Sequence, residues 1–318
     1  ILLGGPHATI LREDAFHASG CFDYLVCGEA EKTIVSLINA LASGENISKV
    51  PGLVMRDNHD IIFTGHAVRE SNLDHILFPD RSDLLPMNYL WSVPQCGMVP
   101  TTSVMFSRGC PFECTFCAQN DMYGRTVRYR SAENLLEELD ELISTTPFRH
   151  FVFNDDTFTA DRERIVKLAQ GIMTRGFRIT FECETRANLL DRELVALLRK
   201  AGLVRINIGI ESGDPEILKT LKNGITLEAV RASLHLLKSF GIETRGSVMI
   251  GAPYERKETV LRTLRFVREL KDLDQPYVNI AAPYPGTIMR EMANPNPFLE
   301  DRDILAELNP PGEMGFIV

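Results

Sequence analysis

Long apolar runs are missing from this chain of 318 residues, in which no 18 consecutive residues are apolar. A helix that crosses a bilayer needs about 20 such residues, so the sequence predicts no membrane span. A basic excess is also missing, because 34 Lys and Arg stand against 43 Asp and Glu, for a net charge of −9. Nucleic-acid-binding surfaces usually carry a basic excess, so no nucleic-acid partner is expected. No low-complexity segment interrupts the chain.

A disulfide framework is not indicated either. The chain has seven cysteines, an odd number, and three of them lie within one short loop. In a chain of this size the pattern favours a reducing compartment, and a cytoplasmic location is expected. The chain opens on the apolar segment ILLGG without an initiator methionine, so we expect it to begin inside a longer protein.

The first seventy residues are typical of part of an α/β domain. ILLGG and FDYLVCG are strand candidates, EKTIVSLINALASG has the pattern of an amphipathic helix, and GLVMRDNHDIIFTG that of a hairpin around Asp57 and Asn58. Two parallel strands do not make a stable open sheet, because three or more strands with helix cover are normally needed. We therefore expect residues 1–70 to be the end of a domain whose earlier strands lie upstream.

Regular alternation of strands and helices is predicted only beyond residue 102. Residues 71–102 have several prolines, the single tryptophan and little periodicity, so they are predicted to be a surface linker. Residues 103–290 contain six strand candidates with helical patterns between them, which predicts a partial (βα)6 TIM-like barrel or a large open parallel sheet. Residues 291–318 are expected to be a truncated C-terminal extension. The six strand candidates are SVMFSRG, HFVFNDDTF, RITFECETR, RINIGIESG, ETRGSVMIGAP and QPYVNIAAPYPGT.

Residues that suit a binding site follow every predicted strand of this second region. Each has the alternative of being an ordinary turn residue. Because chemistry collects at the carboxyl ends of parallel strands, however, six such ends at one rim predict a functional site. The first strand is followed by the cysteine loop, and the others by Asn154 to Asp156, Glu184 and Arg186, Glu211 to Gly213, Gly251 to Glu255, and Pro283 to Thr287.

The loop SRGCPFECTFCAQ places Cys110, Cys114 and Cys117 within eight residues. Thiolates are soft ligands that suit zinc or iron–sulfur chemistry. A structural zinc site and an ordinary iron–sulfur cluster both take four protein ligands. The loop has no histidine, and the cysteines at positions 21, 27, 96 and 183 show no partner spacing. Three thiolates therefore predict a cluster with one iron open to a ligand from outside the protein.

The C-x-x-x-C-x-x-C spacing, with Phe116 before the last cysteine, resembles the cluster-binding loop of the radical S-adenosylmethionine (SAM) enzymes. The resemblance implies a [4Fe–4S] cluster on Cys110, Cys114 and Cys117, with SAM chelated to the open iron. It also implies cleavage of SAM to a 5′-deoxyadenosyl radical that abstracts hydrogen. An electron donor such as ferredoxin or flavodoxin, and a small-molecule or natural-product substrate, follow from the same resemblance.

SAM contacts at the strand ends are implied by this resemblance as well. A carboxylate after the second strand would pair with the SAM ammonium group. Polar groups after the third and fourth strands would contact its carboxylate and ribose, and glycine-containing backbone after the fifth would line the adenine. The arginine after the third strand has the alternative of pairing with a neighbouring acid. The implied positions are Phe116, Asp155, Asp156, Arg186, Glu211, Ser212, Gly251 and Pro253.

The segments GGPHAT and FDYLVCGEAE are similar to the end of the flavodoxin-like cobalamin-binding domain that precedes the barrel in one radical SAM branch. The resemblance implies that Gly4, Gly5, Pro6 and Gly28 lie near the nucleotide tail of the corrinoid. His7 is more simply a turn residue or a contact to the corrinoid tail than a cobalt ligand.

The expected function is therefore that of a cobalamin-dependent radical SAM enzyme, resembling the methyltransferase branch, which methylates an unactivated carbon. Cyclisation or rearrangement is the first alternative, with a non-methylating or vestigial use of cobalamin. A non-catalytic module that binds zinc or a corrinoid is the alternative from another class. Metal identity separates these, since zinc leaves a protein colourless whereas an iron–sulfur cluster is brown.

Overall fold

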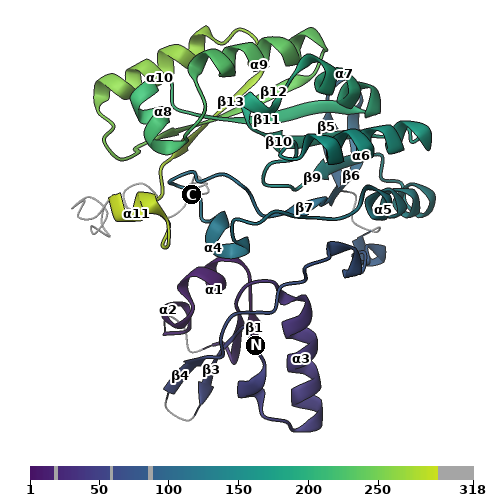
Figure 1. The fold of residues 1–318 in the computed structure, drawn as a ribbon, viewed down its shortest axis with the longest axis vertical. Helices are drawn as coiled ribbons and strands as arrows, with labels where there is room; N and C mark the ends of the chain where they lie inside the picture. The colour runs from purple at the N-terminus through teal and green to yellow at the C-terminus, as the bar shows by residue number, and fades with distance from the viewer. Residues whose placement is uncertain (18–20, 58–59, 85–88, 293–318) are drawn as a thin grey trace. The chain divides into compact units, whose positions relative to one another are not determined.

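The computed structural model describes residues 1–17, 21–57, 60–84 and 89–292 (Figure 1). The chain divides into two compact units. The first comprises Ile1–Phe112, Gln119–Thr185 and Arg192–Arg205, and the second comprises Glu113–Ala118, Arg186–Asp191 and the described residues from Ile206 onward. The cysteine loop is therefore shared, because its first cysteine belongs to the first unit and the other two to the second.

A four-stranded sheet in the order β1-β2-β3-β4 opens the first unit. β1 and β2 are parallel, whereas β2–β3 and β3–β4 are antiparallel. Phe16 packs with Leu25 and Val54 of this sheet, and all three side chains are fully buried. The elements are β1 (Leu2–Leu3), α1 (Pro6–Leu11), α2 (Glu13–His17), β2 (Tyr24–Val26), α3 (Ala30–Ser43), the 3-10 turn Ile47–Lys49, β3 (Leu53–Asp57) and β4 (Asp60–Phe63).

The strands, the long helix and the hairpin predicted for residues 1–70 are confirmed, although Asn58 of the hairpin turn lies outside the described residues. Helices α1 and α2 were not predicted. Pro6 stands at the first position of α1, where its missing N–H costs nothing and its fixed φ suits a helix. The Gly-Gly-Pro turn is therefore also a helix start.

A seven-stranded sheet has the order β13-β12-β11-β10-β9-β6-β5. β6, β9 and β10 pair in parallel, as do β12 and β13, while β5 is antiparallel to β6. Five of the six predicted strands are present, and the first, predicted at residues 103–109, is displaced, because β6 already ends at Val104. The α/β class is confirmed. The strands are β5 (Leu90–Val93), β6 (Gly97–Val104), β9 (His150–Phe153), β10 (Thr180–Thr185), β11 (Leu203–Glu211), β12 (Glu243–Ile250) and β13 (Gln275–Ile280).

Residues 90–102 differ from the prediction of a linker, because they form β5 and most of β6. The first three residues of β5 are exposed, Pro94 begins the turn and Pro100 lies within β6, so the alternation that marks a half-buried strand is missing. The domain boundaries predicted at residues 70 and 102 stay a prediction. The predicted extension 291–318 lies outside the described residues except for its first two.

Helices connect the parallel strands. In the first unit α5, α6 and α7 contact one another in sequence along the sheet (Figure 1). Ser131 caps α5 by accepting a hydrogen bond from the Asn134 N–H at 3.1 Å, as its position in the sequence predicts. The helices are α4 (Gln119–Tyr123), α5 (Ala132–Thr145), α6 (Arg162–Thr174), α7 (Arg192–Ala201), α8 (Pro215–Leu221), α9 (Leu227–Ser239), α10 (Lys257–Glu269) and α11 (Ile288–Met292). The remaining described elements are β7 (Ser107–Arg108), β8 (Arg128–Tyr129) and the 3-10 turns Leu73–His75, Ser82–Leu84 and Ala187–Leu189.

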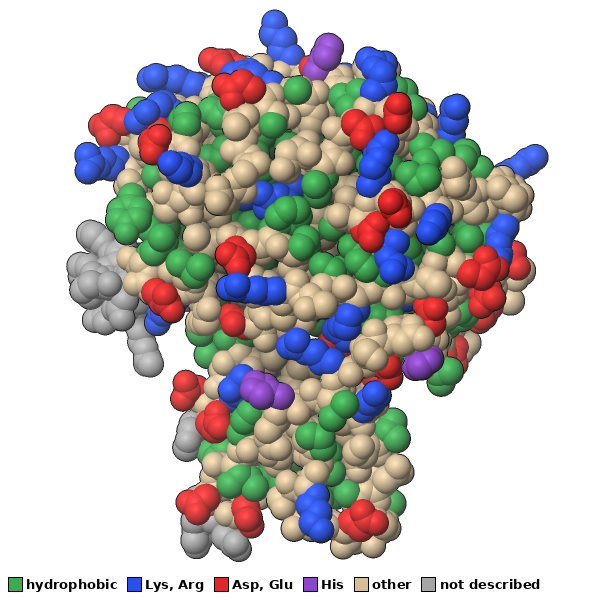
Figure 2. All heavy atoms as spheres, in the orientation of Figure 1, with side chains coloured by type: hydrophobic (Ala, Val, Ile, Leu, Met, Phe, Trp, Pro, Cys, Tyr) green, Lys and Arg blue, Asp and Glu red, His purple; other side chains and the backbone are tan. Residues whose placement is uncertain are grey.

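Charged side chains of both signs are interspersed over the face of the molecule shown in Figure 2. Within the described residues, no helix combines the length and the apolar character that crossing a bilayer requires.

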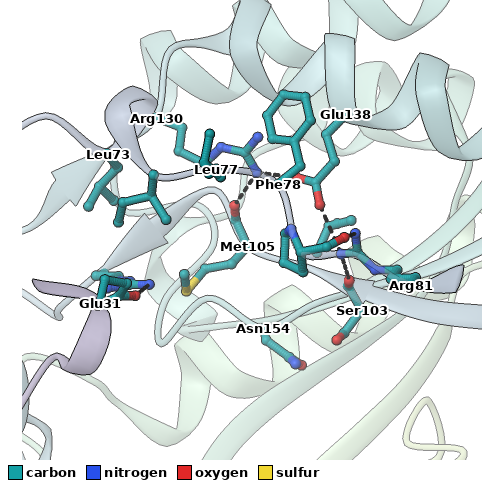
Figure 3. Close-up of a pocket in the computed structure, with 14 residues that line it drawn as sticks. Glu31, Leu73, Leu77, Phe78, Arg81, Ser103, Met105, Arg130, Glu138 and Asn154 are labelled. Carbon is teal, nitrogen blue, oxygen red and sulfur yellow. Dashed lines mark hydrogen bonds and ion pairs between the residues drawn. The ribbon is translucent and has the colours of Figure 1, made fainter. Parts of the chain in front are cut away.

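Glu138 of α5 fastens the segment before β5 to the sheet. Its carboxylate forms an ion pair with Arg81 at 2.8 Å and a second one with Arg130, and all three side chains are nearly buried. Arg81 also donates to the Ser103 carbonyl at 2.8 Å. Figure 3 shows the two arginines reaching Glu138 at one wall of a cavity of about 370 Å³. Apolar side chains of residues 73–79, among them Phe78, contribute to its lining.

Glu138→Gln is expected to destabilise the fold, because two buried guanidinium groups would lose their shared counter-charge. Removal of one partner from a buried ion pair costs about 3 kcal/mol or more. The free energy of unfolding, measured by urea denaturation with circular dichroism, should fall by this amount. Glu137→Gln, at the exposed neighbouring position, is the control and should change little. Equal stability of the two variants would contradict the role of Glu138.

Candidate functional site

The backbone of the cysteine loop is held by three hydrogen bonds within the second unit. The Thr115 N–H donates to the Leu221 carbonyl at 3.0 Å, and the Thr115 carbonyl accepts from the Met289 N–H at 2.7 Å. The Cys117 N–H donates to the Cys114 carbonyl at 3.1 Å, which closes a turn. The loop therefore has a fixed path between the end of α8 and the start of α11, although it has no regular structure of its own.

Phe116 anchors the same loop through its side chain. It packs against a buried apolar cluster that includes Ile217, Leu221, Ala252 and Met289. Phe116, which the resemblance placed among the SAM contacts, thus also supports the loop through this packing. Phe116 is partly buried, so it contributes only part of the roughly 1.5–3 kcal/mol that full burial of a phenylalanine gives.

The thiols of Cys114 and Cys110 have polar neighbours. The Arg186 guanidinium donates to the Cys114 sulfur at 3.6 Å, and its other terminal nitrogen donates to the Asn223 carbonyl at 2.6 Å. In the first unit, the Cys110 sulfur lies 3.3 Å from the Thr157 hydroxyl oxygen. Gly109 has φ 97°, and a Cβ there would lie 3.0 Å from the Thr126 carbonyl oxygen, so this turn requires glycine.

The donor set fits an iron–sulfur cluster in its chemistry. All three thiols are partly exposed, and thiolates are the ligands that such clusters take. In the part of the chain that the structure describes, no three His, Cys, Asp or Glu side chains are placed to hold one metal ion. A four-iron cluster binds each thiolate at a different iron, so the sulfurs of the three loop cysteines need not lie around a single metal ion. Cys110, Cys114 and Cys117 are the residues that would hold it.

Asp155 and Asp156 follow β9 but have different surroundings. Asp155 is 3% exposed, and its oxygens accept from the Phe106 N–H at 3.1 Å and from the Ser107 hydroxyl at 2.5 Å. Burial raises the pKa of Asp155 to about 6 despite these hydrogen bonds. Asp156 is less buried and accepts from the Gln119 amide at 2.5 Å. Burial, and then the charge of Glu184, raise its pKa as well.

Because of this difference, the two carboxylates have different roles. Asp155 fastens the turn between β6 and the cysteine loop, with both oxygens used inside the protein. Asp156 is the more accessible of the two and remains the better candidate for a ligand ammonium group. Gln119, which holds Asp156, was not singled out from the sequence, although it lies only two residues beyond Cys117.

Glu211 ends β11 with φ 62°, an uncommon conformation for glutamate. Its carboxylate is 3.0 Å from the Lys222 ammonium group, which also donates to the Gly209 carbonyl at 3.1 Å. Both charged residues are buried, and a side chain at Gly209 would overlap them. Lys222 therefore orients Glu211 and neutralises it. Lys222 could not be singled out from the sequence, because its partner lies eleven residues away across a helix.

The remaining predicted SAM contacts of the second unit lie in tight turns. Ser212 is fully buried, with its hydroxyl 3.1 Å from that of Thr263. The N–H of Gly251 donates to the Glu255 carboxylate at 2.6 Å. Pro253, half-buried, lies between these two residues in the chain. The Ser212 hydroxyl and the Gly251 N–H are thus occupied by neighbouring side chains of the protein.

The predicted cobalamin contacts are brought together by Thr9. Its hydroxyl donates to the Gly5 carbonyl at 2.8 Å and accepts from the Gly28 N–H at 2.9 Å. Pro6 begins α1 directly after Gly5. Gly4 lies beside β2, since a Cβ there would be 3.7 Å from the Val26 carbonyl oxygen. The two turns that the resemblance singled out therefore form one local structure within the first unit.

Glu29, directly after Gly28, ties this structure to the segment that carries the first cysteine. Its buried carboxylate forms ion pairs with Arg108 at 2.8 Å and with Arg128. Arg108 also reaches Glu31 at 2.5 Å. Burial opposes ionisation of Glu31, but the hydrogen bond and charge of Arg108 lower its pKa. Because Arg108 lies two residues before Cys110, these pairs position the entry to the cysteine loop.

Comparison with known proteins identifies the family. The Radical SAM superfamily model matches residues 104–267, which is more than half of the chain and includes the whole cysteine loop. The chain belongs to the radical SAM superfamily. The prediction made from the cysteine spacing is thereby confirmed at the level of the family, and the position of each ligand contact stays a prediction.

Two curated relatives and one solved structure are similar to this chain beyond the family match. The uncharacterized methyltransferase PH0819 of Pyrococcus horikoshii is 33% identical over 94% of this chain and 64% of its own length. The anaerobic magnesium-protoporphyrin IX monomethyl ester cyclase of Cereibacter sphaeroides is 28% identical over 83% of this chain and 44% of its own length. The chain thus spans 64% and 44% of the lengths of these two relatives.

The solved structure is that of the radical SAM methyltransferase TsrM from Kitasatospora setae, with cobalamin and a [4Fe-4S] cluster bound. It has a TM-score of 0.73 and 20% identity, and the match covers 91% of this radical SAM chain and 56% of that chain. The similarity confirms the predicted fold, an α/β partial barrel preceded by a smaller α/β sheet.

Asp155→Asn should change how stability depends on pH. The pKa of Asp155 is about 6 in the folded chain against an ordinary value of 3.8. The folded chain therefore binds this proton more tightly than the unfolded chain, and the stability gained is present below pH 3.8 and lost as pH rises through 6. The loss for wild type relative to Asp155→Asn should be roughly 2 kcal/mol between pH 4 and pH 7.

Urea unfolding at a series of pH values measures this difference. Asp140→Asn, at an exposed position of α5, serves as the matched control and should follow the wild type. Parallel pH profiles for the wild type and Asp155→Asn would contradict the account of Asp155.

Proposed function

We propose that this chain is the catalytic part of a cobalamin-dependent radical SAM enzyme that methylates an unactivated carbon of a small-molecule or natural-product substrate. The observation that carries the proposal is the three-cysteine loop, held at Thr115 and Phe116, in a chain of the radical SAM superfamily. When bound, a [4Fe–4S] cluster and SAM would supply the 5′-deoxyadenosyl radical. Superfamily membership favours this over the non-catalytic module.

The residues of the chain have separate tasks in this proposal. Asp156, steadied by Gln119, binds the SAM ammonium group. Glu211, held by Lys222, binds the ribose. The turn that contains Gly251 and Pro253 contacts the adenine. The apolar cluster beneath Phe116 excludes water from one side of the loop, which protects a reactive radical.

Cobalamin use is proposed for the turns that Thr9 joins, at Gly4, Gly5, Pro6 and Gly28. Support comes from the methyltransferase relative and from the fold shared with a cobalamin-bound methyltransferase. Cyclisation is the second candidate, because one relative is named as a cyclase. A ferredoxin or flavodoxin as electron donor and a cytoplasmic location belong to the same proposal.

Cys114→Ala tests the cluster on which the proposal rests. After anaerobic reconstitution, the wild type should hold about four irons and four sulfides per chain. The variant loses one of three thiolates, so we expect its iron and sulfide content to fall severalfold. Cys96→Ala, an exposed cysteine outside the loop, is the control and should keep the wild-type content. Unchanged iron and sulfide in Cys114→Ala would remove the cluster assignment.

A further inference from the structure

Arg186 contacts both the cysteine loop and the segment after α8. It is 5% exposed, and one terminal nitrogen lies 3.6 Å from the Cys114 sulfur while the other lies 2.6 Å from the Asn223 carbonyl oxygen. We infer that Arg186 is a positioning residue that acts through Cys114 and raises the reduction potential of the cluster. The inference rests on the proposed function, since it presupposes a cluster at this thiolate.

The physical reason is the charge that reduction adds. A reduced cluster carries one more negative charge than an oxidised one, so a nearby cation stabilises the reduced form. Hydrogen bonds to the sulfurs and solvent exposure are among the factors that set cluster potentials. Arg186 supplies both a donor and a permanent positive charge, and burial limits the screening of that charge by water.

The second contact of Arg186 fixes the first. The guanidinium group is a planar fork, so a nitrogen bound to the Asn223 carbonyl determines where the other terminal nitrogen points. Lysine has a single ammonium group at the end of a flexible chain and lacks this geometry. The charge alone and the fixed hydrogen bond can therefore be separated by substitution.

The neighbour of Cys110, Thr157, does not supply a charged donor like the one that Arg186 supplies to Cys114. The Thr157 hydroxyl lies 3.3 Å from the Cys110 sulfur but also donates to the Asp156 carbonyl at 2.7 Å. A hydroxyl has one proton, so it cannot serve both acceptors at once. The contact at Cys110 is thus neutral and shared, whereas the contact at Cys114 is cationic. Arg186 should accordingly affect the potential more than Thr157 does.

The test is a potentiometric titration of the reconstituted protein, followed by electron paramagnetic resonance without SAM. For Arg186→Gln we expect the ratio of reduced to oxidised cluster at a fixed potential to fall about tenfold, which is a shift of 59 mV to lower potential for a one-electron couple. Arg186→Lys should give an intermediate ratio. Thr157→Val, a neutral change of similar shape at the other thiol, should change the ratio less than twofold.

Arg231→Gln controls for the loss of one positive charge. Arg231 lies in the same unit, its side chain is 44% exposed, and it pairs with Glu269 at 2.7 Å. Its substitution should leave the ratio within twofold of the wild type. An equal shift in Arg231→Gln and Arg186→Gln would overturn the inference, because net charge alone would then explain it.

Three further outcomes decide between the possibilities. An unchanged ratio in Arg186→Gln with a full cluster would overturn the inference, and weaker SAM binding in that variant would then place the guanidinium on SAM. Loss of the cluster from both Arg186 variants, with the fold intact by circular dichroism, would overturn the tuning role and make Arg186 an assembly residue. Failure of the wild type itself to hold a cluster would instead overturn the proposed function.

Discussion

Three thiols have to be held on a stretch of chain that has no secondary structure of its own, and the backbone hydrogen bonds of Thr115 meet this requirement. The N–H and the carbonyl of this one residue join the loop to the end of α8 and to the start of α11. Phe116 adds an apolar anchor beside them. The chemistry proposed here depends on this attachment, because a loop free to move would not present its sulfurs in a constant arrangement to a cluster.

Several buried glutamates of the first unit each contact two basic side chains. Glu29 binds Arg108 and Arg128, Glu138 binds Arg81 and Arg130, and Glu182 contacts Arg205 and His150. Each set joins segments that are far apart in sequence. Buried ion pairs add little net stability over apolar packing, but breaking one is costly, so such sets favour a single arrangement of the segments they join.

Much of the barrel was predictable from the sequence, because alternating strand and helix patterns repeat six times and the helices carry ordinary caps. β5 was not predicted, because its residues are largely exposed and lack the alternation of a half-buried strand. Helices α1 and α2 escaped because each has only a few residues, and a proline after two glycines resembles a turn as much as a helix start.

Some site residues could be identified from the sequence alone, whereas others depend on contacts between distant positions. Cysteine spacing is local information, so the loop could be recognised at once. Asp155 and Asp156 are the same residue type in adjacent positions, and only the direction of their side chains distinguishes them. Arg186 was predicted as a polar residue of the rim, but its contact with Cys114 joins positions 72 residues apart. Lys222 and Thr9 could not be recognised for the same reason, since their partners are tertiary neighbours.

Anaerobic incubation with SAM, a strong reductant and cobalamin, followed by mass spectrometry, tests the central claim most directly. The account predicts 5′-deoxyadenosine as a product, accompanied by S-adenosylhomocysteine if the reaction is methyl transfer and without it if the reaction is cyclisation or rearrangement. An intact cluster that yields neither product would contradict the claim that this chain performs radical SAM chemistry.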